Sequence, residues 1–320
     1  MIPPNNFITS PIKILHIGNS EINIFNTNGK NLDQVVIDDF GEEWKKFNNF
    51  EDPIIQKLGD GYFDIIDDDI VNSQTYCLDV GCGTGRWSKY LAQRAGFIEA
   101  IDPSDSILAA GKLLEGIKNI RLSRSAIDTL PFADNSFDFA MSVGVLHHIP
   151  DTQQALNDCV KKVKAGGYLY IYLYYTLDNR SLLFKFIFHL SNIIRRVTSK
   201  LPGRFKRIVC DILAIIVYMP FILICRLFVW AGFEKLAGRI PLYAYHDKGF
   251  LIIRNDALDR FGTRLEKRFS RDQIIEMMEI AGLTDIVVSP NLPYYHAVGR
   301  KKEFELNQSS ESPLNYPTAG

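Results

Sequence analysis

The segment from Tyr76 to Ala92, YCLDVGCGTGRWSKYLA, is the feature that most constrains the fold of this chain. Its first five residues form an apolar run suited to a buried strand, and a helical stretch follows Gly81, Gly83 and Gly85. Because glycine has no Cβ atom, this backbone can take positive φ and lie against a ligand, and the first helical N–H groups face the same crevice. Strand, glycine turn and helix in this order predict a nucleotide-type binding loop.

Two acidic residues refine this prediction. Asp79 stands inside the strand, two positions before Gly81, so the segment reads D-x-G-x-G-x-G. That version resembles motif I of class I S-adenosylmethionine (SAM)-dependent methyltransferases rather than the dinucleotide fingerprint. Asp102 ends the next apolar run about twenty residues beyond the glycines, where a carboxylate suits a ribose hydroxyl pair. The structural alternative is that Asp102 caps the helix that opens near Ser104.

A third region, residues 125–151, strengthens the resemblance. It contains L-P-F, then D-N-S-F-D and an apolar strand, and it resembles the type 11 group of small-molecule methyltransferases. In that pattern an acid four positions before the leucine commonly meets the adenine amine, but here the position is Ala126 and the nearest acid is Asp128. The resemblance implies SAM as the cofactor and no metal. The cofactor-binding residues it implies are Asp79, Gly81, Cys82, Gly83, Gly85, Asp102, Ala126, Ile127 and Val143, with backbone contacts to adenine from Ala126 and Ile127.

The same resemblance implies an α/β fold, a Rossmann-like sheet of seven strands with helices on both faces and a long, mainly helical insertion after the fifth strand. The expected units are 1–72, an extension whose helix packs on the core; 73–177, the SAM-binding core; 178–269, a basic and apolar helical cap; 270–302, a closing helix and two strands; and 303–320, a disordered tail. Aromatic spacing predicts the helix of the extension over 38–50, packed on the core or in contact with substrate. A glycine cap is expected at 165–167, after the helix over 152–164.

Methyl transfer to an acceptor needs alignment and exclusion of water, and it needs a base only where the acceptor must lose a proton. His147 and His148 either supply that base or start a helix by a hydrogen bond. Tyr174 and Tyr175 end the predicted fifth strand, where ligands bind in open α/β sheets. The catalytic candidates are His147, His148 and Tyr175, and the substrate candidates are Tyr174, Tyr243, Tyr245 and His246. The charged set Asp256, Asp259, Arg260 and Arg264 is interpreted either as ion pairs that pin the insertion or as acceptor-binding groups.

The insertion is unusual in charge and hydropathy. Between Arg180 and Lys235 ten Lys and Arg oppose only Asp211 and Glu234, a net charge of +8 in a chain whose total is −1. Residues 212–225 form an uncharged run of fourteen, whereas a membrane span needs about twenty apolar residues. Basic flanks beside apolar helices also fit attachment to anionic lipid. Three alternatives therefore stay open for 208–233: a cap over the site, a membrane-surface helix with contacts through 180–235, or a true span.

Composition adds few constraints. The five cysteines form no C-x-x-C pair, which suggests neither disulfides nor a zinc site, and the N-terminus lacks the pattern of a secretory signal. We expect a cytoplasmic location, with the inner face of the membrane as an alternative. The expected function is SAM-dependent methylation of an O, N or C atom of a small-molecule, saccharide or lipid-linked acceptor. The alternatives are a tRNA-modifying methyltransferase, although the net charge gives no global argument for nucleic-acid binding, and a SAM-binding protein without catalysis.

Overall fold

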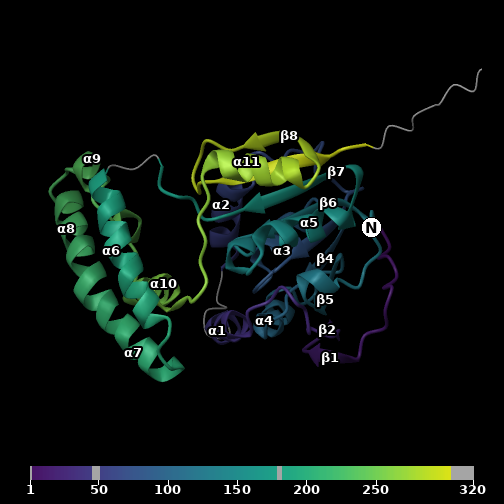
Figure 1. The fold of residues 1–320 in the computed structure, drawn as a ribbon, viewed down its shortest axis with the longest axis horizontal. Helices are drawn as coiled ribbons and strands as arrows, with labels where there is room; N and C mark the ends of the chain where they lie inside the picture. The colour runs from purple at the N-terminus through teal and green to yellow at the C-terminus, as the bar shows by residue number, and fades with distance from the viewer. Residues whose placement is uncertain (1, 45–50, 179–181, 304–320) are drawn as a thin grey trace, which may run out of the picture.

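The computed structural model describes residues 2–44, 51–178 and 182–303, and a nine-stranded sheet forms its centre (Figure 1). The strand order is β1-β2-β5-β4-β3-β6-β7-β9-β8. The strands are β1 (Lys13–Ile17), β2 (Ser20–Ile24), β3 (Tyr76–Val80), β4 (Phe97–Ile101), β5 (Ile120–Arg124), β6 (Phe137–Val143), β7 (Val163–Tyr172), β8 (Leu283–Val288) and β9 (His296–Lys301).

The seven strands from β5 to β8 form the expected sheet, and the fold class is confirmed. Strands β5, β4, β3, β6 and β7 are parallel, and β9 lies antiparallel between β7 and β8. The sheet is two strands wider than expected because the N-terminal extension forms a hairpin. Its second strand, β2, pairs parallel with β5 and buries Ile22 and Ile24.

Helices cover both faces of the sheet. They are α1 (Gln34–Trp44), α2 (Asp52–Tyr62), α3 (Arg86–Leu91), α4 (Ser106–Leu113), α5 (Thr152–Lys162) and α11 (Arg271–Ile280). Side chains of α5 and α11 pack with Leu78 of β3, whereas α3 packs with Cys77. Because adjacent strand residues point to opposite faces, these two clusters lie on either side of the sheet. That double cover explains why the central strands read as unbroken apolar runs.

Two expected local features differ in the structure. Helix α1 begins at Gln34, four residues before the expected start, where the Asp33 carboxylate accepts the N–H groups of Val35 and Val36. The remainder of that expected helix, 45–50, lies outside the described residues. The predicted glycine cap is wrong, because α5 ends at Lys162 and β7 begins at the next residue. The glycines at 166 and 167 instead belong to an irregular stretch of β7 that opposes β6.

The insertion forms a separate helical layer beside the sheet (Figure 1), and α10 reaches the residues after β7 through the hydrogen bond from the Tyr174 hydroxyl to Asp259. Its helices are α6 (Leu182–Thr198), α7 (Gly203–Leu213), the π-helical turn η3 (Ala214–Tyr218), α8 (Met219–Trp230), α9 (Glu234–Ala237) and α10 (Phe250–Gly262). Residues 203–230 form one unbroken helix of 28 residues, which is long and apolar enough to cross a membrane. Its inner face, including Tyr218 and Ile222, packs on Ile253 and Phe261 of α10.

Candidate functional site

A cavity of about 390 Å³ opens at the carboxyl ends of β3, β4 and β6. Strand order reverses between β3 and β6, and open α/β sheets bind ligands at such a switch point. Helix α1 borders the cavity through Val36, Ile37 and Phe40, and the insertion borders it through side chains of η4 (Tyr243–Tyr245) and α10. The site is therefore built from three regions that are far apart in the sequence.

The three glycines of the loop have different physical roles. All three have positive φ, at 77° for Gly81, 57° for Gly83 and 82° for Gly85. A Cβ atom on Gly81 would meet the Val145 side chain at 2.6 Å, and one on Gly85 would meet Leu114 at 2.6 Å. At Gly83 a Cβ would meet no atom within 4 Å. Gly81 and Gly83 line the cavity and Gly85 does not, so only Gly83 leaves open space where a ligand would lie.

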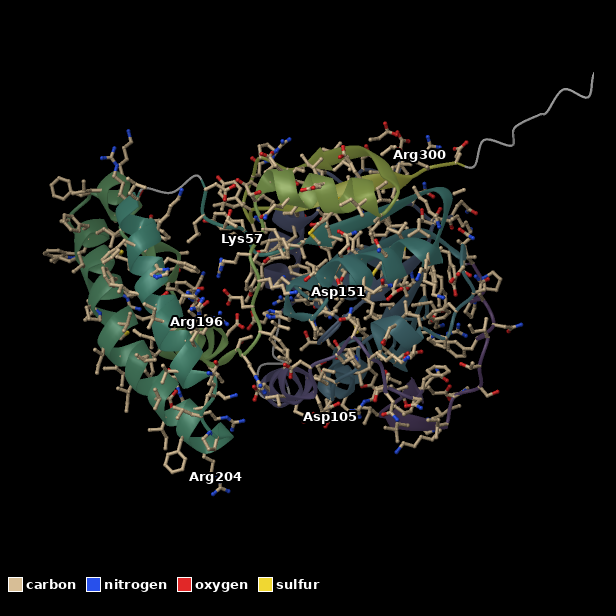
Figure 2. The ribbon with its side chains drawn as sticks, in the orientation of Figure 1. Lys57, Asp105, Asp151, Arg196, Arg204 and Arg300 are labelled. Atoms are coloured by element: carbon tan, nitrogen blue, oxygen red, sulfur yellow. The ribbon has the colours of Figure 1, made fainter. Side chains whose placement is uncertain are left out.

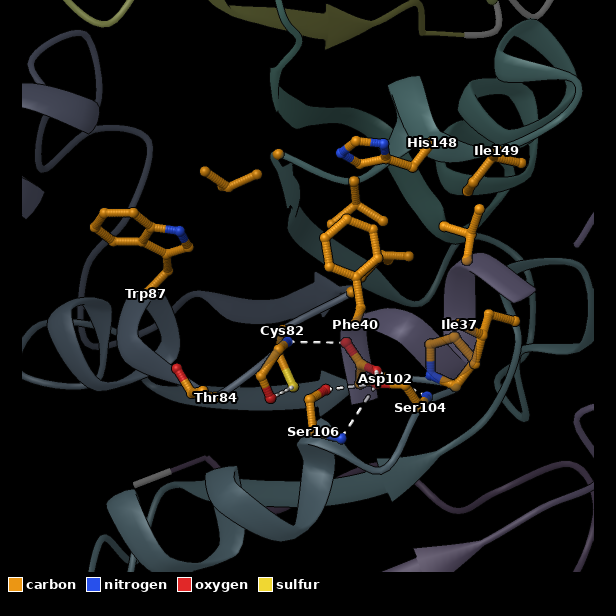
Figure 3. A pocket seen from close by; sticks show the side chains of 18 of the residues that line it. Ile37, Phe40, Cys82, Thr84, Trp87, Asp102, Ser104, Ser106, His148 and Ile149 are labelled. Carbon is orange, nitrogen blue, oxygen red and sulfur yellow. Dashed lines mark hydrogen bonds between the residues drawn. The ribbon is translucent and has the colours of Figure 1, made fainter. Parts of the chain in front are cut away.

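Asp102 is fixed on both of its oxygen atoms. Oδ2 accepts the Gly83 N–H at 2.9 Å, and Oδ1 accepts the Ser104 N–H at 2.8 Å and its hydroxyl at 2.6 Å. Figure 3 shows this group on one side of the cavity with His148 on the other. Asp102 thus joins the glycine loop to the start of the α4 region. Each carboxylate oxygen has two lone pairs, so Oδ1 is fully engaged and Oδ2 can still accept one further hydroxyl.

Asp79 lies behind the loop and is almost completely buried. Its Oδ2 accepts the Ser88 hydroxyl at 2.6 Å, and Oδ1 has no hydrogen-bond partner among the described residues. Burial, aided by the charge of Asp102, raises the pKa of Asp79 to about 7, although the Ser88 bond opposes the shift. Asp79 itself does not line the cavity, so a positively charged group bound there would favour the ionised carboxylate from behind the loop.

Because of this raised pKa, SAM binding is expected to release protons. A bound cation favours the charged carboxylate, so at pH 7 up to about half a proton should leave Asp79 for each SAM bound, and none at pH 9. Titration calorimetry in buffers of different ionisation enthalpy measures this release, which Asp79→Asn should remove. Proton release that persists in Asp79→Asn would assign this release to another group.

The raised pKa of Asp79 also affects the stability of the fold. Asp79 favours folding below about pH 4, and this contribution is lost as the pH rises through 7.

The residues predicted to lie beside adenine differ in whether they line the cavity. Ile127 lines the cavity, as do Cys82 and Val143, whereas Ala126 is fully buried and Ser125 takes its place in the lining. The nearest acid, Asp128, serves a different purpose: its Oδ2 accepts the backbone N–H of Lys30 at 2.6 Å and thereby holds the N-terminal extension.

The two histidines differ in their exposure to the cavity. His148 lines it, and its Nδ1 lies 2.7 Å from the Leu265 carbonyl oxygen, which requires a proton on Nδ1. His147 does not line it; both of its ring nitrogens lack partners among the described residues, and its ring stacks on Tyr174 at 3.9 Å. Burial lowers the pKa of His148 to about 4 and that of His147 well below its usual range, so both rings are neutral at pH 7.

The tyrosine candidates and His246 also differ in whether they line the cavity. Tyr174 and Tyr245 line the cavity, whereas Tyr175, Tyr243 and His246 do not. Tyr175 forms an isolated bridge with Phe269, and the rings of Tyr243 and His246 stack on each other at 4.5 Å. The same cavity wall contains residues that were not predicted to bind, namely Tyr62, Thr84, Arg86, Trp87, Ser104, Ser106, Tyr172 and Ile252. It also contains Phe40, which belongs to the aromatic stripe that predicted the helix over 38–50 and, as one alternative, its contact with substrate.

Of the predicted charged set, only two members, both in α10, line the cavity; Arg260 and Arg264 do not. Asp256 and Asp259 line it, and neither has an ion-pair partner among the described residues. Arg260 instead pairs with Glu266 at 3.2 Å. Across the described ranges, no group of three or more His, Cys, Asp or Glu is arranged to hold a metal ion.

Comparison with known proteins agrees with this geometry. Residues 78–171 match a family model described as a methyltransferase domain. The demethylmenaquinone methyltransferases of Listeria monocytogenes and Staphylococcus aureus are 35% identical over 105 residues and 36% over 101. These alignments cover 31% and 30% of this chain and 44% and 42% of the relatives, so the chain spans less than half the length of the curated relatives it matches.

Solved structures of methyltransferases are similar at low identity. A SAM-dependent methyltransferase from Aquifex aeolicus is 16% identical with a TM-score of 0.40, over 79% of this chain and 98% of that one. Phosphoethanolamine N-methyltransferase 2 of Haemonchus contortus, in complex with SAM, is 17% identical with a TM-score of 0.43, over 78% and 42%.

The family match begins inside β3 and ends inside β7, so it contains the glycine loop, Asp102 and Val143. Sheet order, loop and match together define a class I SAM-dependent methyltransferase domain of the type 11 group in this chain. The residues present fit SAM on two observations. The buried Asp79 carboxylate behind the loop has an Oδ1 without a partner among the described residues, and Gly83 leaves space in the cavity that a Cβ would fill. The expected family and cofactor are thus confirmed.

Proposed function

We propose that this protein transfers a methyl group from SAM to a lipid-linked acceptor at a membrane surface, on the cytoplasmic side. The observation that carries the proposal is the position of the insertion. Its α10 side closes the cavity opposite the glycine loop, and its other surface is apolar with basic side chains beside it. One element therefore borders the reaction site and offers a surface suited to lipid.

The contribution of the protein to this reaction is chiefly positioning. SAM supplies an electrophilic methyl group on a positively charged sulfur. Gly83 would allow close backbone approach of the cofactor, Asp102 would accept a ribose hydroxyl, and Ser125 and Ile127 would border the adenine. The aromatic wall with Tyr172 and Tyr174 excludes water, which strengthens electrostatic interactions and keeps the acceptor aligned.

The apolar surface of the insertion is large. Trp230 is 85% exposed, Ile216 65% and Leu227 60%. The other exposed apolar side chains of α6 to α9 are Leu182, Phe186, Leu190, Ile193, Ile194, Val197, Phe205, Ile208, Ile212, Ile215, Leu223, Ile224, Phe233 and Leu236. Soluble proteins rarely expose contiguous apolar patches above a few hundred Å² unless the patch binds something.

Basic residues accompany this surface, as anionic lipid would require. Arg196, Lys200, Arg204 and Lys235 are exposed, and Figure 2 shows Arg204 projecting from one end of the layer. The long helix uses its inner face to pack on α10, which favours a helix lying along the membrane surface over one that crosses it alone.

The relatives suggest the chemistry of the acceptor. By their names, they methylate demethylmenaquinone. We propose an acceptor of this lipid-linked kind for the present chain, because a membrane-resident molecule would be presented at the same surface on which the insertion rests.

The test begins with calorimetric titration of SAM and, separately, NAD. Binding of SAM without a response to NAD is expected. Radiolabelled SAM is then supplied with three acceptors: vesicles of total bacterial lipid containing demethylmenaquinol, a water-soluble metabolite extract, and bulk tRNA. Label in the lipid fraction supports the proposal. Label in the soluble or the tRNA fraction instead would replace the acceptor class, and SAM binding with no labelled fraction would favour a non-catalytic role.

A further inference from the structure

The carboxylates of Asp256 and Asp259 are the acidic groups that the insertion brings to the cavity. They stand three residues apart in α10, so both point from one face of the helix. Both line the cavity, together with Tyr174 and Tyr245. Cofactor positioning, assigned above to the glycine loop and Asp102, makes no use of them.

The two carboxylates differ in how their oxygens are engaged. Asp256 accepts the Tyr218 hydroxyl at 2.7 Å on Oδ2 and the Tyr245 hydroxyl on Oδ1. Asp259 has longer bonds, with the Tyr174 hydroxyl at 3.2 Å and the Thr263 hydroxyl at 3.2 Å. Asp256 is thus held firmly by neutral donors, whereas Asp259 is the less saturated acceptor and the freer one to take a proton.

The nearby arginines do not neutralise Asp259 directly. Arg260 and Arg268 contact Glu266 at 3.2 Å and 2.9 Å, and the Arg268 guanidinium also lies 5.2 Å from the centre of the Tyr174 ring. The Glu266 carboxylate is therefore the partner of both cations. Asp259 is left with hydroxyl donors alone among the described residues, an arrangement that favours proton uptake more than a salt bridge would.

Titration makes both carboxylates candidates, because burial also raises the pKa of Asp256 to about 6, and the hydrogen-bond geometry is what distinguishes them. Burial, followed by the charge of Glu266, raises the pKa of Asp259 to about 6. A carboxylate with that pKa is mostly ionised at pH 7 and is a stronger base than an ordinary aspartate. His148, with its pKa lowered by burial to about 4, is the weaker base at the same cavity. The titratable and charged groups that face Asp259 are Asp256 and Arg260 of its own helix, Tyr174, Tyr245, Glu266 and Arg268.

We propose that Asp259 is the general base of the methyl transfer and that Asp256 is a positioning residue, which orients Tyr245 on the acceptor side. The inference rests on the proposed function and deepens it, because the acceptor must then carry an ionisable proton, either on the methylated atom or on a hydroxyl conjugated with it, as a phenol, quinol or enol does. The acceptor proton passes to Asp259 as the acceptor–methyl bond forms. The sulfur–methyl bond breaks with its electron pair left on sulfur, and S-adenosylhomocysteine leaves as a neutral thioether.

The test compares three variants of the full chain in the lipid-vesicle assay with demethylmenaquinol. Asp259→Asn is expected to lower kcat by about 10²- to 10⁴-fold. In the wild type kcat/KM should rise with pH through about 6 and then level off, because the base acts when deprotonated. Asp256→Asn should keep that pH dependence and mainly raise the KM for the acceptor. Asp247→Asn, a surface aspartate of the same insertion paired with Lys248, is the matched control and should behave as wild type.

SAM affinity and melting temperature are measured on every variant. Unchanged SAM affinity in Asp259→Asn, with activity lost, supports the assignment. Full activity in Asp259→Asn, or a pH limb that remains near 4 in place of one near 6, would overturn it and point to His148. Wild-type protein that binds SAM and labels no lipid acceptor would instead contradict the proposed function, and the assignment of a base would fall with it.

Discussion

Gly83→Ala is expected to weaken SAM binding at least about 100-fold, which corresponds to about 2.7 kcal/mol. Gly83 lines the cavity with a φ of 57°, and a Cβ added there meets no protein atom within 4 Å. The new methyl group would therefore occupy space left for the ligand and would not clash with the fold. Calorimetric titration with SAM measures the loss directly.

The control variant Gly116→Ala distinguishes the effect of backbone strain from the effect of blocking the space for the ligand. Gly116 also has a positive φ, at 83°, and its added Cβ also meets nothing within 4 Å, but it lies outside the cavity lining. Both substitutions should cost a similar 1–2 kcal/mol or so of stability, because both force alanine into the left-handed region. Only Gly83→Ala should reduce SAM affinity. Equal SAM affinity in the two variants would mean that the cofactor does not approach the loop at Gly83.

The sheet and the cofactor loop were predictable because their signals are local. An apolar run from Tyr76, an acid at Asp79 and alternating glycines lie within ten residues, and each has a direct backbone consequence. The position of Asp102 beside the loop was also predictable, because β4 runs parallel to β3 and must end next to the loop. The strand β2 was missed, although Ile22 and Ile24 alternate with polar residues as a half-buried strand requires.

The acceptor side could not be predicted from local pattern. Tyr62, Tyr174 and Asp259 come from three regions of the chain and meet only because α10 returns to the sheet after the long helical layer. The sequence left Asp256 and Asp259 open between ion pairing and acceptor binding. Their geometry in the fold separates them from Arg260, whose partner is Glu266. Likewise, Tyr175 adjoins Tyr174 in sequence, but both lie beyond the end of β7 at Tyr172, where Tyr175 bridges to Phe269 and Tyr174 alone of the two lines the cavity.

The extent of the apolar helix was also hidden by charges in its sequence. Asp211 and Arg226 bound the uncharged run of fourteen residues, yet both lie within one helix of 28 residues. Asp211 pairs with Arg254 of α10, and Arg226 donates to the carbonyl oxygens of His246 and Lys248. These charges are directed toward the rest of the protein. They interrupt the apolar pattern in sequence without interrupting the apolar outer surface.

From that surface we expect the double variant Ile216→Glu/Leu227→Glu to lose binding to anionic vesicles by at least about 100-fold. Each wild-type side chain can contribute roughly 1.5–3 kcal/mol by leaving water, and each glutamate adds repulsion from anionic lipid. Both positions are exposed on the protein, at 65% and 60%, so the substitution should leave the fold intact. Co-sedimentation with vesicles containing phosphatidylglycerol, at several salt concentrations, measures the loss.

The matched control is Ile280→Glu/Leu292→Glu, which introduces the same charges at side chains 64% and 63% exposed outside the insertion. It should bind vesicles almost as wild type does, since only the insertion contacts lipid. Release of the wild-type protein by high salt and alkaline washing is expected for a surface helix, whereas retention until detergent is added would mean a true span. The wild-type protein could instead fail to bind vesicles and form a dimer in light scattering that the double variant abolishes. A second copy of the chain would then cover the apolar surface of the insertion. The insertion would then act as a cap and an interface, and the acceptor would have to reach the cavity from solution.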